Sequence, residues 1–392
     1  MNSFVSYHPT KVVFGNHGVD QLGSLLVEQG CKKVMVVYGG NSAIKSGLLD
    51  QVTEIMDSAG IAHVSIGGVV PNPLLSKVKE GIALGVKEEV DLILAVGGGS
   101  VIDSSKAMGL GIFHGGEVWD FFEGKRATKG SIPIATILTL PAAGSEMSDS
   151  CVITKDEGML KRYCGHVDCS CKFAIMDPML TLTLPDYQTF CGATDILMHT
   201  MERYFNTTTN LDITDSIAEA LLRSVMKNAL LLKEDANNLE ARWNVMWAGS
   251  LSHNGLTAYG ADGGDWGTHD MEHELAGLYD VTHGAGLAAI WGSWARYVCD
   301  AIPHRFEKFA VEVMKVETGS NQADTIAKGI EEMEKFFGSI GMPISLTELG
   351  VSPTEEEFEE MGIKGTHFET KTIGSAKPLG KADIIAILKA AK

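Results

Sequence analysis

The chain has 392 residues, of which 45% are apolar and 21% charged, so it can bury a large core and is too long for one compact unit. It carries 32 basic and 50 acidic side chains, and the resulting net charge of −18 argues against a surface that binds nucleic acid or anionic membranes. We therefore expect small molecules as partners.

The first eleven residues show no secretory signal, and no apolar stretch is long enough to span a bilayer. We expect a cytoplasmic protein that binds no membrane. The seven cysteines are an odd number, and several stand isolated along the chain, which predicts reduced thiols rather than a disulfide framework.

Strand and helix patterns alternate in the first part of the chain, which predicts a parallel sheet with helices on both faces. Strands are expected at 33–38, 62–66, 92–96, 132–140 and 173–176, helices at 47–58 and 74–87, and an irregular stretch between the last two strands.

The pattern changes after Pro185, where amphipathic segments with helical periodicity replace the alternation. Long helices are expected at 213–232, 238–253 and 325–340. The boundary is placed near Asp186, so that an α/β domain covers 1–186 and a helical domain 187–392.

A glycine run, Gly97 to Gly99, follows the predicted strand at 92–96 and precedes a helix. Glycines allow the backbone to approach a pyrophosphate, and the first turn of a helix offers unpaired N–H groups to it. The run differs from the usual GxGxxG pattern and is also compatible with a tight strand-to-helix turn. Asp103 and Lys106 follow, either as an exposed ion pair or with Asp103 facing the ribose beside a nicotinamide.

The strand at 33–38 ends in Gly39, Gly40, Asn41 and Ser42, with Lys45 shortly after. A pocket that prefers NAD often places an acid there to bind the free ribose hydroxyl, and an acid would repel a 2′-phosphate. Because this segment supplies hydrogen-bond donors and no acid, it favours NADP(H), although it can also be read as a simple polar turn.

An aspartate and three histidines have spacings that suit one divalent metal ion. Asp195 and His199 are four residues apart and share one face of a helix, and His269 and His273 repeat that spacing before His283. Imidazole and carboxylate suit iron, zinc and similar metals, and four such ligands predict an open catalytic site. Taken singly, each histidine reads as a core or surface residue and Asp195 as a helix cap; the joint pattern reverses this interpretation.

Seven segments in order carry a resemblance to a known family. They are YGGNS, VPNPLLSKV, GGGSVIDSSKA, LPAAGSEMS, MDPMLTLTLP, GATDILMHTMERY and THDMEHELAGLYDVTHGAGLA. With these motifs the chain resembles the iron-containing alcohol dehydrogenase family from end to end, most closely its butanol dehydrogenase and NADPH-dependent aldehyde reductase branch.

The resemblance implies an N-terminal Rossmann-like dinucleotide-binding α/β domain and an all-α C-terminal domain, the dehydroquinate synthase-like architecture. It also implies a divalent metal, Fe²⁺ or Zn²⁺, in the cleft between the domains, commonly a homodimer, and interconversion of short-chain primary alcohols and aldehydes with NADP(H). An NAD-dependent polyol dehydrogenase of the same fold is the alternative, and a fold-retaining binding protein without catalysis is a more distant one.

Site residues follow from the resemblance position by position. The metal ligands are Asp195, His199, His269 and His283, and His273 is expected near the nicotinamide, where it orients substrate or relays a proton; its alternative role is a packed helix histidine. The cofactor-binding residues are Gly39, Gly40, Asn41, Ser42, Asn72, Pro73, Gly98, Gly99, Ser100 and Asp103, with Thr139, Ser148, Lys161 and Leu180 as weaker candidates. Many relatives have threonine where this chain has Ala143, so one hydroxyl contact to the cofactor is expected to be missing.

Two further groups of residues have ordinary interpretations beside the functional ones. Cys164, His166, Cys169 and Cys171 resemble soft metal ligands, but their spacing fits no zinc or iron–sulfur pattern, so a hairpin or loop near the cofactor is expected. Trp266, Tyr259 and Leu256 are candidates for the lining of the substrate pocket, with helix packing as the alternative.

Overall fold

The computed structural model describes all 392 residues and divides them into two compact units. One unit, called here the α/β unit, comprises Tyr7–Leu184. The other, called the helical unit, comprises Pro185–Lys392 together with Met1–Ser6. The predicted fold class, a parallel-sheet domain followed by an all-helical domain, is confirmed.

The α/β unit is built on a six-stranded parallel sheet with the order β1-β8-β5-β4-β2-β3. Its strands are β1 (Lys11–Phe14), β2 (Lys33–Tyr38), β3 (Ala62–Ile66), β4 (Leu92–Gly98), β5 (Ile134–Leu140) and β8 (Phe173–Met176). The central strand β4 is buried from Leu92 to Gly97, as expected of a parallel strand covered on both faces. β5 begins after Pro133, which has no N–H to donate to the ladder.

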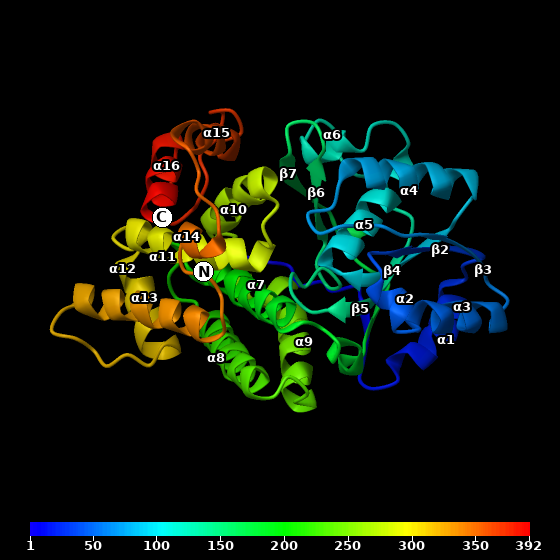
Figure 1. Cartoon of the computed structure of the whole chain (residues 1–392), viewed down its shortest axis with the longest axis horizontal. Helices are drawn as coiled ribbons and strands as arrows, with labels where there is room; N and C mark the ends of the chain where they lie inside the picture. Colours follow the sequence, from blue (N-terminus) through cyan, green and yellow to red (C-terminus); the bar gives the residue numbers. More distant parts are fainter. The chain divides into compact units, whose positions relative to one another are not determined.

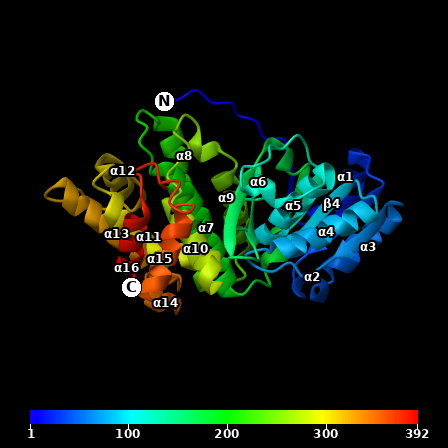
Figure 2. The same cartoon turned by 90° about the horizontal axis from the view of Figure 1, so that it is seen from above.

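Helices cover both faces of this sheet (Figure 1). On one face α1 (Leu22–Gln29) and α3 (Leu48–Ser58) bury Leu26, Val52 and Met56 against β2, β4 and β5. On the other face α4 (Leu75–Lys87) and α5 (Gly99–His114) lie side by side, as Figure 2 shows. The short helices α2 (Ser42–Lys45) and α6 (Trp119–Phe122) complete the unit.

The stretch between β5 and β8, expected to be irregular with a hairpin or loop at Cys164 to Cys171, contains an antiparallel hairpin of β6 (Ser150–Lys155) and β7 (Leu160–Gly165), and Cys164 lies on β7. In its register Cys151 lies opposite Cys164. Both are buried, as are Cys169 and Cys171, and all seven cysteines of the chain are free thiols.

The helical unit contains α7 to α16, and the segments between them include a 3-10 helix at Leu256–Ala258 and a π-helix at Phe309–Val313. The bounds are α7 (Asp186–Tyr204), α8 (Asp212–Glu234), α9 (Leu239–His253), α10 (Gly267–Tyr279), α11 (His283–Val298), α12 (Pro303–Lys308), α13 (Gln322–Ser339), α14 (Leu346–Leu349), α15 (Glu355–Gly365) and α16 (Lys381–Ala390). The helices α8 and α9 lie side by side in both views (Figures 1 and 2). No helix of the chain combines the length and the apolar character needed to cross a bilayer.

A single apolar core runs through the helical unit. Aromatic side chains dominate it, with Phe205 stacked on Phe306 at 4.3 Å and Trp291 fully buried beside Phe309. The first residues of the chain also belong to this unit: Asn2 N–H donates to Gly260 O at 2.8 Å, and Phe4 stacks on Tyr259.

Candidate metal centre and cofactor-binding turns

Helix α7 supplies the first two predicted ligands. Its segment from Thr189 to Tyr204 is buried, so polar side chains within it need internal partners. Asp195 and His199 stand one turn apart on the same face, and His199 Nδ1 lies 2.9 Å from the backbone oxygen of Asp195. This contact within the helix orients the imidazole and leaves its Nε2 side for another partner.

Helices α10 and α11 form a hairpin that brings His269 and His283 together. The turn between them is closed by Asp280, which adopts a left-handed conformation with φ 51° that aspartate tolerates better than most residues. The two imidazole rings consequently lie 5.3 Å apart, although 14 positions separate them in the sequence.

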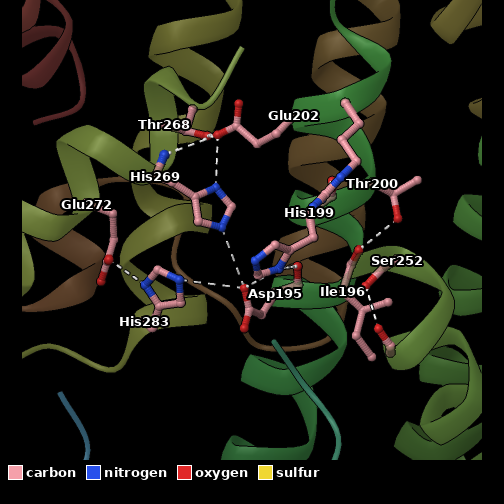
Figure 3. A network of polar contacts seen from close by, with 12 residues as sticks. Asp195, Ile196, His199, Thr200, Glu202, Ser252, Thr268, His269, Glu272 and His283 are labelled. Carbon is pink, nitrogen blue, oxygen red and sulfur yellow. Dashed lines mark hydrogen bonds and ion pairs between the residues drawn. The ribbon is translucent and has the colours of Figure 1, made fainter. Parts of the chain in front are cut away.

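The four predicted ligands converge on one carboxylate oxygen (Figure 3). Asp195 Oδ1 lies 3.0 Å from His199 Nδ1, 3.8 Å from His269 Nε2 and 3.6 Å from His283 Nε2. Asp195, His199 and His269 place ligand atoms within 4.8 Å of one another; His283 lies outside that tightest group and is the most exposed of the four.

The donor set fits a divalent metal ion. Ligand atoms about 2.1 Å from a tetrahedral centre lie about 3.4 Å apart, close to the separations between Asp195 Oδ1 and the two Nε2 atoms. In addition, Asp195 Oδ1 and His269 Nε2 are buried without a hydrogen-bond partner. These two atoms are 3.8 Å apart, and burying polar atoms without hydrogen bonds costs free energy. An ion bound between them would remove that cost.

Burial and the neighbouring charges shift the pKa values of these groups in different directions. Burial would raise the pKa of Asp195, but the imidazoles of His199 and His283 hold it well below its usual range. Burial lowers the pKa of His199 to about 4. Burial also opposes protonation of His269, yet the carboxylates of Asp195 and Glu202 raise its pKa to about 9. These pKa shifts favour the anionic form of Asp195, the neutral form of His199 and the protonated form of His269.

Two buried glutamates that are not among the predicted site residues contact His269 and His283 at Nδ1, the ring nitrogen that does not face Asp195. Glu202 Oε1 lies 3.0 Å from His269 Nδ1, and Glu272 Oε2 contacts His283 Nδ1 at short range (Figure 3). A sequence signal for Glu202 existed, because Asp195, His199 and Glu202 are spaced four and three residues apart on one helical face. Glu272 likewise follows His269 by three residues.

The second histidine of α10, His273, lies at the edge of the cluster. The centroid of the His273 ring is 6.0 Å from that of the His283 ring. The ring centroid of Trp266 lies 5.3 Å from that of His269. Trp266 directly precedes α10 and adopts a left-handed conformation with φ 65°. Such a conformation is rare for a bulky residue. Of the other two candidates for the pocket lining, Tyr259 stacks on Phe4 and Leu256 begins a short 3-10 helix.

All predicted cofactor-binding residues belong to the α/β unit. Most of them lie where parallel strands end, the edge at which such sheets bind ligands. Gly39 to Ser42 follow β2; Asn72 and Pro73 precede α4; Gly98, Gly99, Ser100 and Asp103 lie at the junction of β4 and α5; Thr139 is near the end of β5; Leu180 follows β8; Ser148 precedes β6 and Lys161 lies on β7.

At the junction of β4 and α5 the backbone turns without room for a side chain. A Cβ atom at Gly97 would lie 2.5 Å from Val101 Cγ2, and α5 begins directly at Gly99. The first N–H groups of this 16-residue helix are therefore presented at the strand end, as a phosphate cradle requires.

Asp103 and Lys106 do not form an exposed ion pair. Asp103 accepts hydrogen bonds from Ser145 Oγ at 2.5 Å and from Val152 N–H at 2.9 Å. Lys106 is fully buried, and its ammonium group donates to the backbone oxygens of Ser145, Ser148 and Ser150. Both side chains anchor the segment that leads into β6.

Two family models match the chain. The model "Iron-containing alcohol dehydrogenase" matches residues 9–178, and "Fe-containing alcohol dehydrogenase family, C-terminal" matches residues 189–392. The chain belongs to the iron-containing alcohol dehydrogenase family. It is therefore an NAD(P)-dependent alcohol dehydrogenase, an enzyme that interconverts alcohols and aldehydes, and membership implies a divalent metal and a nicotinamide cofactor.

Relatives of this alcohol dehydrogenase are similar to it over almost their whole length. It is 38% identical to NADH-dependent butanol dehydrogenase A of Clostridium acetobutylicum over 99% of each chain. It is 30% identical to NADPH-dependent aldehyde reductase YqhD of Escherichia coli, covering 93% of this chain and 94% of the relative. Among solved structures, NADH-dependent butanol dehydrogenase A of Thermotoga maritima matches with a TM-score of 0.95 at 37% identity, covering 100% of this chain and 99% of the other.

Proposed function

We propose that this dehydrogenase interconverts short-chain primary alcohols and aldehydes with NADP(H), using one divalent ion held by Asp195, His199, His269 and His283. The observation that carries the proposal is the convergence of three imidazoles on Asp195 Oδ1, where two buried atoms, Asp195 Oδ1 and His269 Nε2, have no hydrogen-bond partner. Three imidazoles and one carboxylate suit Fe²⁺ and Zn²⁺, and the ion that is bound depends on supply as well as on ligands.

The bound ion would supply Lewis acidity toward an alcohol or carbonyl oxygen. The residues of the chain have three other tasks. The turn at Gly98 and Gly99 holds the pyrophosphate of the cofactor, and His199, His269 and His283 hold the metal ion together with Asp195. The imidazole of His273 transfers a proton to the product oxygen when an aldehyde is reduced.

The cofactor preference rests on the end of β2. Residues 39–46 contain no acid, and Lys45 lies on α2 directly after them, so nothing there repels a 2′-phosphate. The relatives named above include both an NADH-dependent and an NADPH-dependent enzyme. We infer that NADP(H) is accepted, and that short linear aldehydes are the substrates, in line with the butanol-type names of those relatives.

The test is anaerobic purification with metal analysis, followed by assays with NADPH and NADH against a ladder of linear aldehydes and a diol. We expect one metal ion per chain and aldehyde-dependent oxidation of NADPH. His269→Ala and His283→Ala should each lose bound metal and turnover while the nicotinamide cofactor still binds. Retained turnover in a metal-free variant would reject the ligand assignment, and turnover with NADH alone would reject the cofactor proposal.

A further inference from the structure

We propose that Glu202 and Glu272 are positioning residues of the metal centre: each fixes one histidine so that its Nε2 faces Asp195, and together they set the affinity of the centre for a divalent ion. This inference deepens the proposed function and rests on it. It concerns two buried carboxylates that lie behind the ligands rather than among them.

Glu202 is fixed on α7 by a set of converging donors. Its Oε1 accepts hydrogen bonds from the backbone N–H of His269 at 3.1 Å and from the hydroxyl of Thr268. A backbone N–H can only donate, so this oxygen is an acceptor. The imidazole Nδ1 of His269, 3.0 Å from the same oxygen, must then carry the proton. That leaves Nε2 with its lone pair directed at Asp195 Oδ1 once the ring is neutral.

Glu272 does the same for the second arm of the hairpin. Its side chain is fully buried, and its Oε2 contacts Nδ1 of His283. The neighbouring helix leaves space for it only because residue 286 is glycine: a Cβ atom there would lie 3.0 Å from Glu272 Cγ and 3.1 Å from Oε1. The position of this carboxylate is therefore defined by packing as well as by its hydrogen bond.

Both pairs have the arrangement in which an outer carboxylate orients a histidine and increases its basicity as a metal ligand. His199 needs no such residue, because its Nδ1 is already held by the backbone oxygen of Asp195. All three imidazoles thus have a partner at Nδ1, and Nε2 of His269 and of His283 faces Asp195 Oδ1. Counting Asp195, three carboxylates surround the ion position, and this charge favours a divalent cation over a monovalent one.

The experiment measures the affinity of the full-length, metal-depleted protein for Co²⁺ by competition with a chelator, together with the visible absorption of bound Co²⁺. We expect Glu202→Gln and Glu272→Gln each to weaken binding by roughly 10- to 100-fold and to change the Co²⁺ spectrum. Glu274→Gln is the matched control, because Glu274 is also buried and lies on α10 like Glu272, but it packs toward Gly365 of α15. Its affinity and spectrum should equal those of the wild type.

Gly286→Ala distinguishes the effect of the position of Glu272 from the effect of its charge. This variant retains both carboxylates, but the added methyl group crowds Glu272. It should weaken Co²⁺ binding in the same direction as Glu272→Gln, and it remains informative if Glu202→Gln fails to fold. If both glutamine variants fold and bind Co²⁺ within twofold of the wild type with an unchanged spectrum, the inference is overturned while the metal centre stands. If the wild type binds no Co²⁺, the metal centre itself is rejected and the inference with it.

Discussion

Lys106 illustrates how single residues determine the local structure of the α/β unit. Its ammonium group is removed from water and donates to Ser145 O at 2.6 Å, Ser150 O at 2.8 Å and Ser148 O at 3.0 Å. Charge-assisted hydrogen bonds of this kind are stronger than neutral ones and compensate the desolvation of the cation. The residue therefore connects α5, which starts at the proposed phosphate-binding turn, to the segment before β6.

Replacing Lys106 by methionine should destabilise the α/β unit by about 3–5 kcal/mol, because the carbonyls of Ser145, Ser148 and Ser150 lose their donor and Asp103 loses the nearby positive charge. Urea denaturation measures the change. Lys79→Met is the control: Lys79 pairs with Glu117 at 2.8 Å, but both are half exposed, so a loss below about 1 kcal/mol is expected. Equal losses in the two variants would contradict this account.

The raised pKa of His269, about 9, has a consequence for metal binding. Below that pH the imidazole is protonated in the ion-free protein, so an incoming ion must displace the proton. His199, with its pKa lowered to about 4, is already neutral. The dissociation constant for Zn²⁺ should fall roughly tenfold per pH unit between pH 6.5 and 8.5, with release of about one proton per ion. Calorimetric titration in two buffers of different ionisation enthalpy tests this, and an affinity independent of pH would refute it.

At this scale the sequence identified the four converging side chains and missed the two glutamates behind them. Metal ligands stand out because a histidine and an aspartate at helical spacing are an unusual combination. A glutamate such as Glu272 in a polar helix segment resembles a surface residue, and only the burial of α10 in the structure reveals its role. The burial of Lys106 was equally hidden, since lysine is almost never fully buried.

At the scale of elements, the centre depends on the close approach of α7 and α11. Gly284, directly after His283, lies against the backbone of Cys191, and a Cβ atom there would overlap the carbonyl oxygen of Cys191. Because the obstacle is backbone rather than a flexible side chain, any substitution must separate the helices. The separation would move His283 away from Asp195.

Gly284→Ala should therefore reduce metal occupancy strongly and destabilise the helical unit by about 1–3 kcal/mol. Gly338→Ala is the matched control on α13, where a Cβ atom would meet nothing within 4 Å. Helix propensity predicts a gain of roughly 0.5–1 kcal/mol for that variant. Thermal unfolding and metal analysis measure both, and full metal occupancy in Gly284→Ala would show that the close approach is unnecessary.

Elements with strong periodicity could be predicted well. β2, β3 and β8 begin and end at the expected residues, and α8, α9 and α13 cover the expected segments with small shifts at their ends. The edge strand β1 and the hairpin of β6 and β7 gave no comparable signal. β1 has only four residues and is half exposed, and the hairpin alternates buried and exposed residues with charges among them.

At the scale of the whole molecule, the proposed cofactor-binding residues and the proposed metal ligands belong to different units. The turns assigned to the cofactor belong to Tyr7–Leu184, and the proposed ligands belong to the unit that contains Pro185–Lys392. Each unit has its own apolar core, so a ligand that binds one unit should stabilise mainly that unit. The sequence pattern places a boundary near Asp186 but does not show that the first six residues join the helical unit.

Hydrogen exchange should resolve the two effects. Chelation of the metal is expected to increase exchange in α7, α10 and α11, because an ion held by the proposed ligands would crosslink these helices, and to leave the amides of β2 and β4 unchanged. Addition of NADP⁺ should increase protection at the start of α5. Loss of protection in β4 on chelation would contradict the assignment of the ion to the helical unit.

The attachment of Met1–Ser6 to the helical unit has a consequence for biosynthesis. The residues that contact this hexapeptide, Tyr259 and Gly260, are synthesised about 250 residues later. At cellular elongation rates that delay is on the order of 10–50 s. When the α/β unit has been fully translated, Met1–Ser6 cannot yet dock, because the segment around Tyr259 has not been synthesised.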